Sequence, residues 1–200
     1  MIDLRKLPKT ELHLHFEGAV PPETLLRLIH KYGDRSKVPD LTTLQSKFRY
    51  RDCRDFIAVY VWAVKYFREY EDFSLAASGI VRELAAQSVR YAEIYFSPGL
   101  FERVGLKLQL LAKAIRAGLS ISGEVKTRLM VDLVRESGPA RGDRQLSQAA
   151  EVAGEADIVA IGIGGSEGGF PPHPFAPVFR RAEALGLHRE IGRASCRERV

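Results

Sequence analysis

The sequence predicts an α/β protein in which a parallel sheet is covered by helices. Residues 89–96, 125–133 and 158–163 are apolar on both faces, as buried parallel strands are. A helical pattern follows each of them. A further strand-like stretch, which ends near Gly18 and is also followed by a helix, precedes the series. This alternation gives four consecutive β–α units.

The helices are predicted from apolar residues spaced three and four positions apart. Pro22 suits the first turn of a helix that ends near Gly33. Two longer helices, at residues 53–66 and 71–87, interrupt the alternation after the first strand, and their aromatic residues are expected in the core. The remaining helices are expected at residues 41–48, 106–119, 140–153 and 174–185.

Composition and charge exclude several classes of function. The 200 residues are 46% hydrophobic, which is typical of a soluble globular domain. The net charge of +5 comes without a long basic run, so charge alone does not support nucleic-acid binding. Cys53 and Cys196 lie outside any CxxC spacing, which excludes a thiolate zinc cluster. No segment resembles a signal peptide or a membrane span. We therefore expect a cytoplasmic protein.

Residues 9–18 carry the most distinctive pattern, a short strand that ends in a tight glycine turn. His13 and His15 share one face of this strand because side chains alternate with a period of two, and Glu17 continues that face. Two imidazoles and a carboxylate that converge at a strand end indicate a metal site. Histidine pairs are also common on surfaces. The position of the pair at a strand end favours the metal-site interpretation, because the reactive groups of β/α barrels lie at the carboxyl ends of the strands.

The segment at residues 8–18 resembles the opening of the adenosine deaminase family, amidohydrolase-type zinc enzymes. The resemblance continues through residues 91–98, 131–135 and 159–167. It implies a truncated TIM (β/α)8 barrel, made of the first four βα units with a helical insertion after the first strand. Residues 1–189 are accordingly interpreted as the N-terminal half of a metal-dependent deaminase barrel.

The resemblance also implies a chemistry. His13 and His15 would be two of three histidine ligands to a catalytic Zn²⁺, which activates water for attack on the amine-bearing carbon of a purine. Ammonia would then leave from adenosine or a related adenine compound. Substrate binding is assigned to four residues at strand ends and in the following turns: Glu17, Ser97, Arg135 and Gly165.

Alternative roles explain three of these residues equally well. Gly165 lies among other glycines in a strand-to-helix turn, and buried hydrogen bonding accounts for Ser97 and Arg135. Glu17 stands where family members that act on adenosine usually have Asp, so the sugar-side pocket should differ. Relatives with Glu at this position resemble deaminases of other adenine compounds, including aminodeoxyfutalosine.

The C-terminal residues 190–200 depart from the pattern. They hold five charges, lack strand alternation and resemble a translated sequencing adapter, so we interpret them as a non-native tail. Nothing after His188 resembles the family's His-Ala-Gly-Glu segment, which supplies the third zinc histidine and the proton-donating glutamate. A catalytic zinc site needs three protein ligands. We therefore expect the chain as written to be inactive, without a catalytic acid or base, and to fold poorly.

Two other functions remain open from the sequence. A different hydrolase is one, since this barrel supports many chemistries. A non-catalytic binding module built on the half-barrel is the other. The cytidine-type zinc deaminases are excluded, because their H-x-E and P-C-x-x-C motifs are absent from the sequence.

Overall fold

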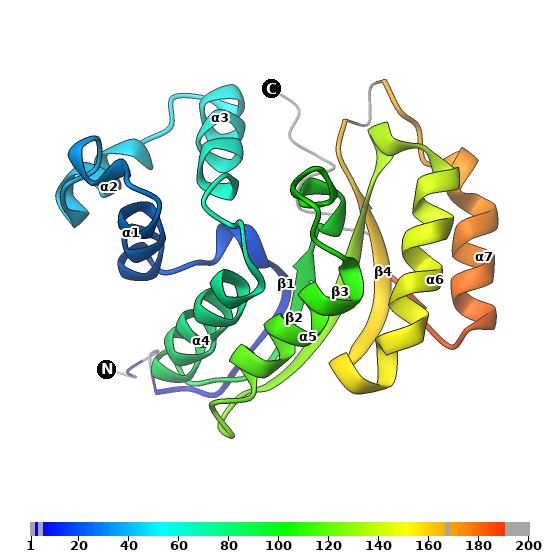
Figure 1. Ribbon diagram of the computed structural model, residues 1–200. Coiled ribbons are helices and arrows are strands. Elements are labelled where there is room, and N and C mark those ends of the chain that lie inside the picture. The colour runs from blue at the N-terminus through cyan, green and yellow to red at the C-terminus, as the bar shows by residue number, and fades with distance from the viewer. Residues whose placement is uncertain (1–2, 4–5, 167–168, 191–200) are drawn as a thin grey trace.

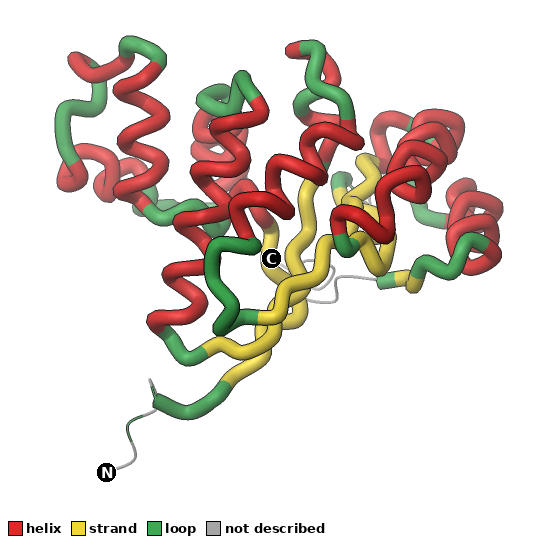
Figure 2. Tube along the Cα trace, turned by 60° about the horizontal axis from the view of Figure 1, so that its bottom comes forward, coloured by secondary structure: helices red, strands yellow, loops and turns green. Residues whose placement is uncertain are grey.

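The computed structural model describes residues 3, 6–166 and 169–190. Its sheet has five parallel strands in the order β1-β2-β3-β4-β5, each paired with the next. Figures 1 and 2 show the helices that connect the strands lying along one side of this curved sheet. The strands are β1 (Lys9–His15), β2 (Val89–Phe96), β3 (Lys126–Val134), β4 (Ile158–Gly164) and β5 (His188–Arg189). The predicted α/β fold is confirmed.

Local sequence signals account for the ends of several helices. Pro22 opens the first helix, and Gly33, with φ at +86°, stands just beyond its end in the left-handed region that glycine tolerates. The carboxylates of Asp40 and Asp52 cap the next two helices. The helices are α1 (Pro22–Lys31), α2 (Leu41–Lys47), α3 (Cys53–Val64), α4 (Tyr70–Ala86), α5 (Leu108–Leu119), α6 (Pro139–Ala156) and α7 (Ala176–Ala184). None in the described chain is long and apolar enough to cross a membrane.

The expectation that the aromatic face of α3 belongs to the core is wrong for part of that helix. Phe56 is 44% exposed, Ile57 49% and Val61 49%. Burial begins at the C-terminal end of the helix, at Ala63, and continues in the residues that follow, such as Phe67. Helical periodicity identifies an apolar stripe but not the element that covers it. In Figure 1, α3 stands above β1 with one side open.

An aromatic cluster fixes the turn that follows β1. The Phe73 ring of α4 lies 5.9 Å from Phe16, 5.0 Å from Phe67 and 4.7 Å from Phe101, measured between ring centroids. All four side chains are buried. Aromatic pairs of this kind stabilise by about 0.5–1.5 kcal/mol beyond their buried area. Because Phe16 lies between His15 and Glu17 in the chain, the cluster anchors the backbone on which both side chains stand.

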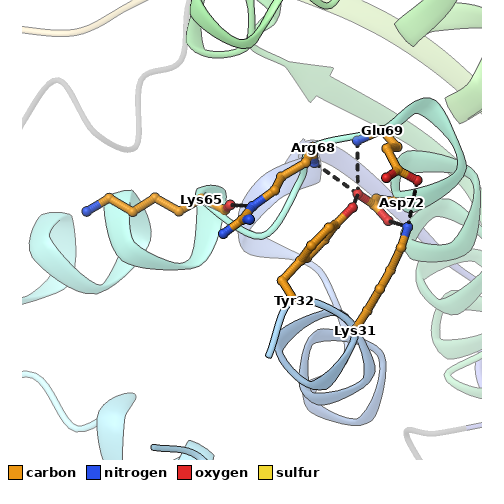
Figure 3. A network of polar contacts seen from close by, with 6 residues as sticks. All are labelled: Lys31, Tyr32, Lys65, Arg68, Glu69 and Asp72. Atoms are coloured by element: carbon orange, nitrogen blue, oxygen red, sulfur yellow. Dashed lines mark hydrogen bonds and ion pairs between the residues drawn. The ribbon is translucent and has the colours of Figure 1, made fainter. Parts of the chain in front are cut away.

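Asp72 joins the end of α1 to the start of α4 (Figure 3). Its buried carboxylate accepts hydrogen bonds from Lys31 Nζ at 2.6 Å and from the Tyr32 hydroxyl at 2.5 Å. The backbone N–H groups of Arg68 and Glu69 donate to it at 2.9 and 3.0 Å. A buried carboxylate with four donors is well compensated for its lost hydration. This network therefore holds the end of α1 against the start of α4.

The fifth strand is short in the described chain. His188 pairs with Ala160 and Arg189 with Ile161, so a fifth strand begins after the four expected β–α units. Glu190 continues the ladder by donating its N–H to the Ile161 carbonyl at 3.0 Å. The rest of the tail interpreted as non-native, residues 191–200, lies outside the described residues.

Candidate metal and substrate site

His13 and His15 lie at the carboxyl end of β1 and point at each other. Their Nε2 atoms are 3.2 Å apart. A tetrahedral zinc ion with Zn–N bonds near 2.05 Å holds two ligand nitrogens about 3.3 Å apart, so the pair fits such an ion. Burial and the neighbouring His13 lower the pKa of His15, which favours the neutral imidazole that metals bind. In the described chain, no group of three or more His, Cys, Asp or Glu side chains converges on one point.

The ring of Tyr95, on β2, packs against both histidines. Its ring centroid lies 4.4 Å from that of His13 and 5.5 Å from that of His15. Gly162 of β4 makes room for it, since a Cβ there would lie 2.6 Å from the Tyr95 ring. Tyr95 is 2% exposed, and its buried hydroxyl has no hydrogen-bond partner among the described residues. The ring therefore limits the orientations that both imidazoles can take.

Glu17 and Ser97, both expected at the site, are in direct contact. Ser97 follows β2 and donates its backbone N–H to Glu17 Oε1 at 2.8 Å. The Ser97 hydroxyl donates to Asp132 Oδ2 of β3 at 3.0 Å. All three residues are buried. One serine thus bridges two carboxylates from neighbouring strand ends.

Burial sets the electrostatics of these carboxylates. It raises the pKa of Glu17 to about 7, and the Asp132 charge adds to the shift while the Ser97 N–H opposes it. Burial likewise raises the pKa of Asp132 to about 6, against the Ser97 hydrogen bond and the positive charge of Arg135. Burial, together with the charges of Glu17 and Asp132, raises the pKa of Tyr60 on α3. Glu17, Asp132 and Tyr60 therefore share one poorly hydrated site.

Arg135 and Gly165 lie nearby, but both have structural partners. Arg135 is 2% exposed, and its Nη1 donates to the Phe170 carbonyl at 3.3 Å. Gly165 has φ at +102°, and a Cβ there would overlap the Glu136 carboxylate. Glu136 also accepts the Ser166 N–H at 2.7 Å. These contacts favour structural roles in the turn after β4, and the substrate-binding roles of Arg135 and Gly165 stay predictions.

Three residues of the site were missed by sequence reasoning. Asp132 carried a usable signal, because a charged residue within an otherwise apolar buried strand needs an explanation. Tyr95 alternates with buried neighbours and gave no signal of its own. Tyr60 was assigned to the core by helical spacing, although it approaches the carboxylates instead.

Comparisons with known proteins identify the family that this chain resembles. The profile of the family described as adenosine deaminase matches residues 8–193. The chain is 31% identical over 187 residues to an adenine deaminase of Bordetella avium, covering 92% of this chain and 58% of the relative. It is 35% identical over 185 residues to an aminodeoxyfutalosine deaminase of Streptomyces avermitilis, covering 90% and 52%. The chain thus spans little more than half the length of these curated relatives.

Solved structures show the same arrangement of strands and helices. An adenine deaminase from Arthrobacter aurescens superposes with a TM-score of 0.79 at 29% identity, covering 91% of this chain and 56% of that one. An amidohydrolase from Burkholderia ambifaria, solved with bound Zn, superposes with a TM-score of 0.81 at 24% identity, covering 94% and 52%. The described strands therefore correspond to part of a larger amidohydrolase barrel.

Proposed function

Because this chain belongs to the adenosine deaminase family, we propose that it forms the N-terminal half of a zinc-dependent aminohydrolase. That enzyme would replace the purine amine of adenosine or a related adenine compound with a carbonyl and release ammonia. The substrate class rests on relatives named as adenine deaminase and aminodeoxyfutalosine deaminase. The zinc assignment is supported by the related amidohydrolase with bound Zn.

The observation that carries the proposal is the 3.2 Å separation of the His13 and His15 Nε2 atoms at the end of β1. A bound zinc ion supplies Lewis acidity and lowers the pKa of water toward about 7. His13 and His15 would hold it as neutral imidazoles, and Tyr95 would restrict their rings. Glu17 and Ser97 would bind the substrate beside them.

The described residues do not supply a complete set of catalytic groups. Two histidines fall short of the three protein ligands that catalytic zinc sites require. We therefore propose that the remaining ligands and the proton donor come from the other half of the barrel, and that residues 1–200 alone are inactive. In this view residues 190–200 are not part of the natural sequence, which would continue in another way after residue 189.

The test is ammonia release by the full-length protein, obtained by sequencing the gene across codon 189. Adenine, adenosine and aminodeoxyfutalosine form the substrate panel, and residues 1–200 alone form the matched comparison. We expect ammonia from at least one compound with the full-length protein and from none with residues 1–200. Hydrolysis without ammonia would favour another hydrolase on this barrel. Binding without turnover and without a zinc requirement would favour a non-catalytic module.

A further inference from the structure

The two carboxylates bridged by Ser97 each keep an oxygen available for a ligand. Glu17 accepts the Ser97 N–H on Oε1, while its buried Oε2 has no hydrogen-bond partner among the described residues. Asp132 accepts the Ser97 hydroxyl on Oδ2, and within the described chain no hydrogen bond reaches Oδ1. A buried oxygen without a partner, such as Glu17 Oε2, is unfavourable, so a donor from outside the chain would stabilise it.

Asp132 has little freedom to move away from this position. Its carboxylate lies against the backbone at the end of β4, where a Cβ on Gly164 would be 2.7 Å from Oδ2 and 3.0 Å from Oδ1. On the other side, the Ser97 hydroxyl holds it at 3.0 Å. Since the aromatic cluster around Phe16 anchors the neighbouring Glu17, both acceptors are fixed before a ligand arrives.

We propose that Asp132 is a specificity-determining residue. Asp132 and Glu17, held in place by Ser97, together accept hydrogen bonds from hydroxyl groups of an adenine compound. These hydroxyl groups lie on the part of the compound that does not react. This inference rests on the proposed deaminase function. It assigns to Asp132 a direct contact with the substrate, whereas a purely structural role would leave substrate preference unchanged.

The chemistry of the pair selects among adenine compounds. In its ionised form this pair only accepts hydrogen bonds, so the ligand must bring the donors. Sugar hydroxyls suit this role, as they do where an acidic residue binds ribose in dinucleotide-binding folds. Free adenine has no hydroxyl group, and a nucleotide places its phosphate charge near two carboxylates, which repel it. The pair therefore favours a nucleoside over the free base and over the 5′-nucleotide.

The first test compares full-length wild-type protein with Asp132→Asn, which keeps the side-chain size and one oxygen for Ser97. We expect kcat/KM for adenosine to fall by roughly 10- to 100-fold, the loss that a hydrogen bond to a charged acceptor accounts for. The value for adenine should change by less than about 3-fold, since adenine carries no hydroxyl. Asp143→Asn is the matched control, because Asp143 is a half-exposed α6 residue that pairs with Arg181. An unchanged adenosine-to-adenine ratio in Asp132→Asn would overturn the inference.

The second test leaves the protein unaltered and changes the substrate. Adenosine is compared with its 2′-deoxy, 3′-deoxy and 5′-deoxy forms in the wild-type enzyme, and at least one loss of a hydroxyl should lower kcat/KM about 10-fold or more. Equal values for all four compounds would overturn the inference while leaving the deaminase function intact. If no compound releases ammonia, the proposed function fails. Calorimetry then still tests the carboxylate pair. Wild type should bind adenosine more tightly than adenine, and Asp132→Asn should abolish that difference. Equal binding of the two compounds by wild type would overturn the inference.

Discussion

Gly164 and Asp132 are in contact at the adjoining ends of β4 and β3, where a Cβ on Gly164 would lie 2.7 Å from Asp132 Oδ2. Gly164→Ala should therefore displace the Asp132 carboxylate and break its hydrogen bond with Ser97. We expect the free energy of unfolding of the full-length protein to fall by about 1–3 kcal/mol in urea denaturation. Gly154→Ala is the control, since nothing lies within 4 Å of a Cβ on this exposed α6 glycine. It should stabilise by roughly 0.5–1 kcal/mol. Equal effects of the two substitutions would show that the contact is not tight.

Asp72→Asn should destabilise the protein. The Tyr32 hydroxyl and the Arg68 and Glu69 N–H groups all donate to Oδ2, a place that the amide oxygen can keep. The neutral amide loses the ion pair with Lys31, because its NH₂ group then replaces Oδ1 and cannot accept from Lys31 Nζ. We expect the free energy of unfolding at pH 7 to fall by about 1.5–3 kcal/mol, measured by urea denaturation. Asp143→Asn, which removes an exposed ion pair, should cost less than about 1 kcal/mol. A cost for Asp72→Asn no larger than that of the control would contradict the role of the network.

The same carboxylate predicts an acid-dependent loss of stability. Burial alone would raise the pKa of Asp72, but hydrogen bonds from Lys31, Tyr32 and two backbone N–H groups hold that pKa below its usual value. A lowered folded-state pKa stabilises the protein above the unfolded-state value of about 3.9, and this stabilisation is lost as the pH falls through the folded-state pKa. The unfolding free energy of wild type should thus drop more steeply below about pH 4 than that of Asp72→Asn. If the unfolding free energies of wild type and Asp72→Asn fell in parallel with pH, Asp72 would not contribute to the acid-dependent loss of stability.

His13→Ala and His15→Ala should each abolish tight zinc binding by the full-length protein. Loss of a ligand should weaken affinity by more than the roughly 10- to 100-fold that changes in residues supporting the ligands cause. Competition with a chromogenic chelator gives the affinity without depending on activity. His173→Ala, at an exposed histidine outside the site, should bind zinc like wild type. Wild-type affinity in both ligand variants would refute the assignment.

Tyr95→Ala and Tyr95→Phe should differ sharply. Removing the ring frees both imidazoles, so Tyr95→Ala should weaken zinc affinity by roughly 10- to 100-fold. Tyr95→Phe keeps the ring and removes a buried hydroxyl that has no partner among the described residues, so affinity and stability should be close to wild type. The chelator competition, run beside circular dichroism to confirm folding, makes the comparison. A large loss in Tyr95→Phe would mean that the hydroxyl has a partner elsewhere in the complete barrel.

Much of the fold could be predicted because local patterns agree with the tertiary structure. Residues 89–96 form β2 with the expected bounds. A short apolar run between two turns, in a chain where strands and helices alternate, is best explained as a buried strand. The exposed positions of Phe56 and Ile57 on α3 could not be predicted in the same way. Periodicity shows that a helix has an apolar side, but the partner of that side depends on contacts far along the chain.

The candidate site was predictable where its geometry is local. The period of a strand places His13 and His15 on one face, and their convergence follows directly. The contact between Glu17 and Ser97 spans 80 positions and depends on the pairing of β1 with β2, which no local pattern specifies. The bridge to Asp132 requires the third strand as well. The zinc ion, the substrate roles and the cytoplasmic location stay predictions.

The most direct test of the account measures zinc content and ammonia release on one preparation of the full-length protein. We predict one zinc per chain, ammonia release from an adenine compound, loss of that release on chelation and its return when zinc is restored. The opposite result, undiminished ammonia release after the metal is removed from the site of His13 and His15, would contradict the account.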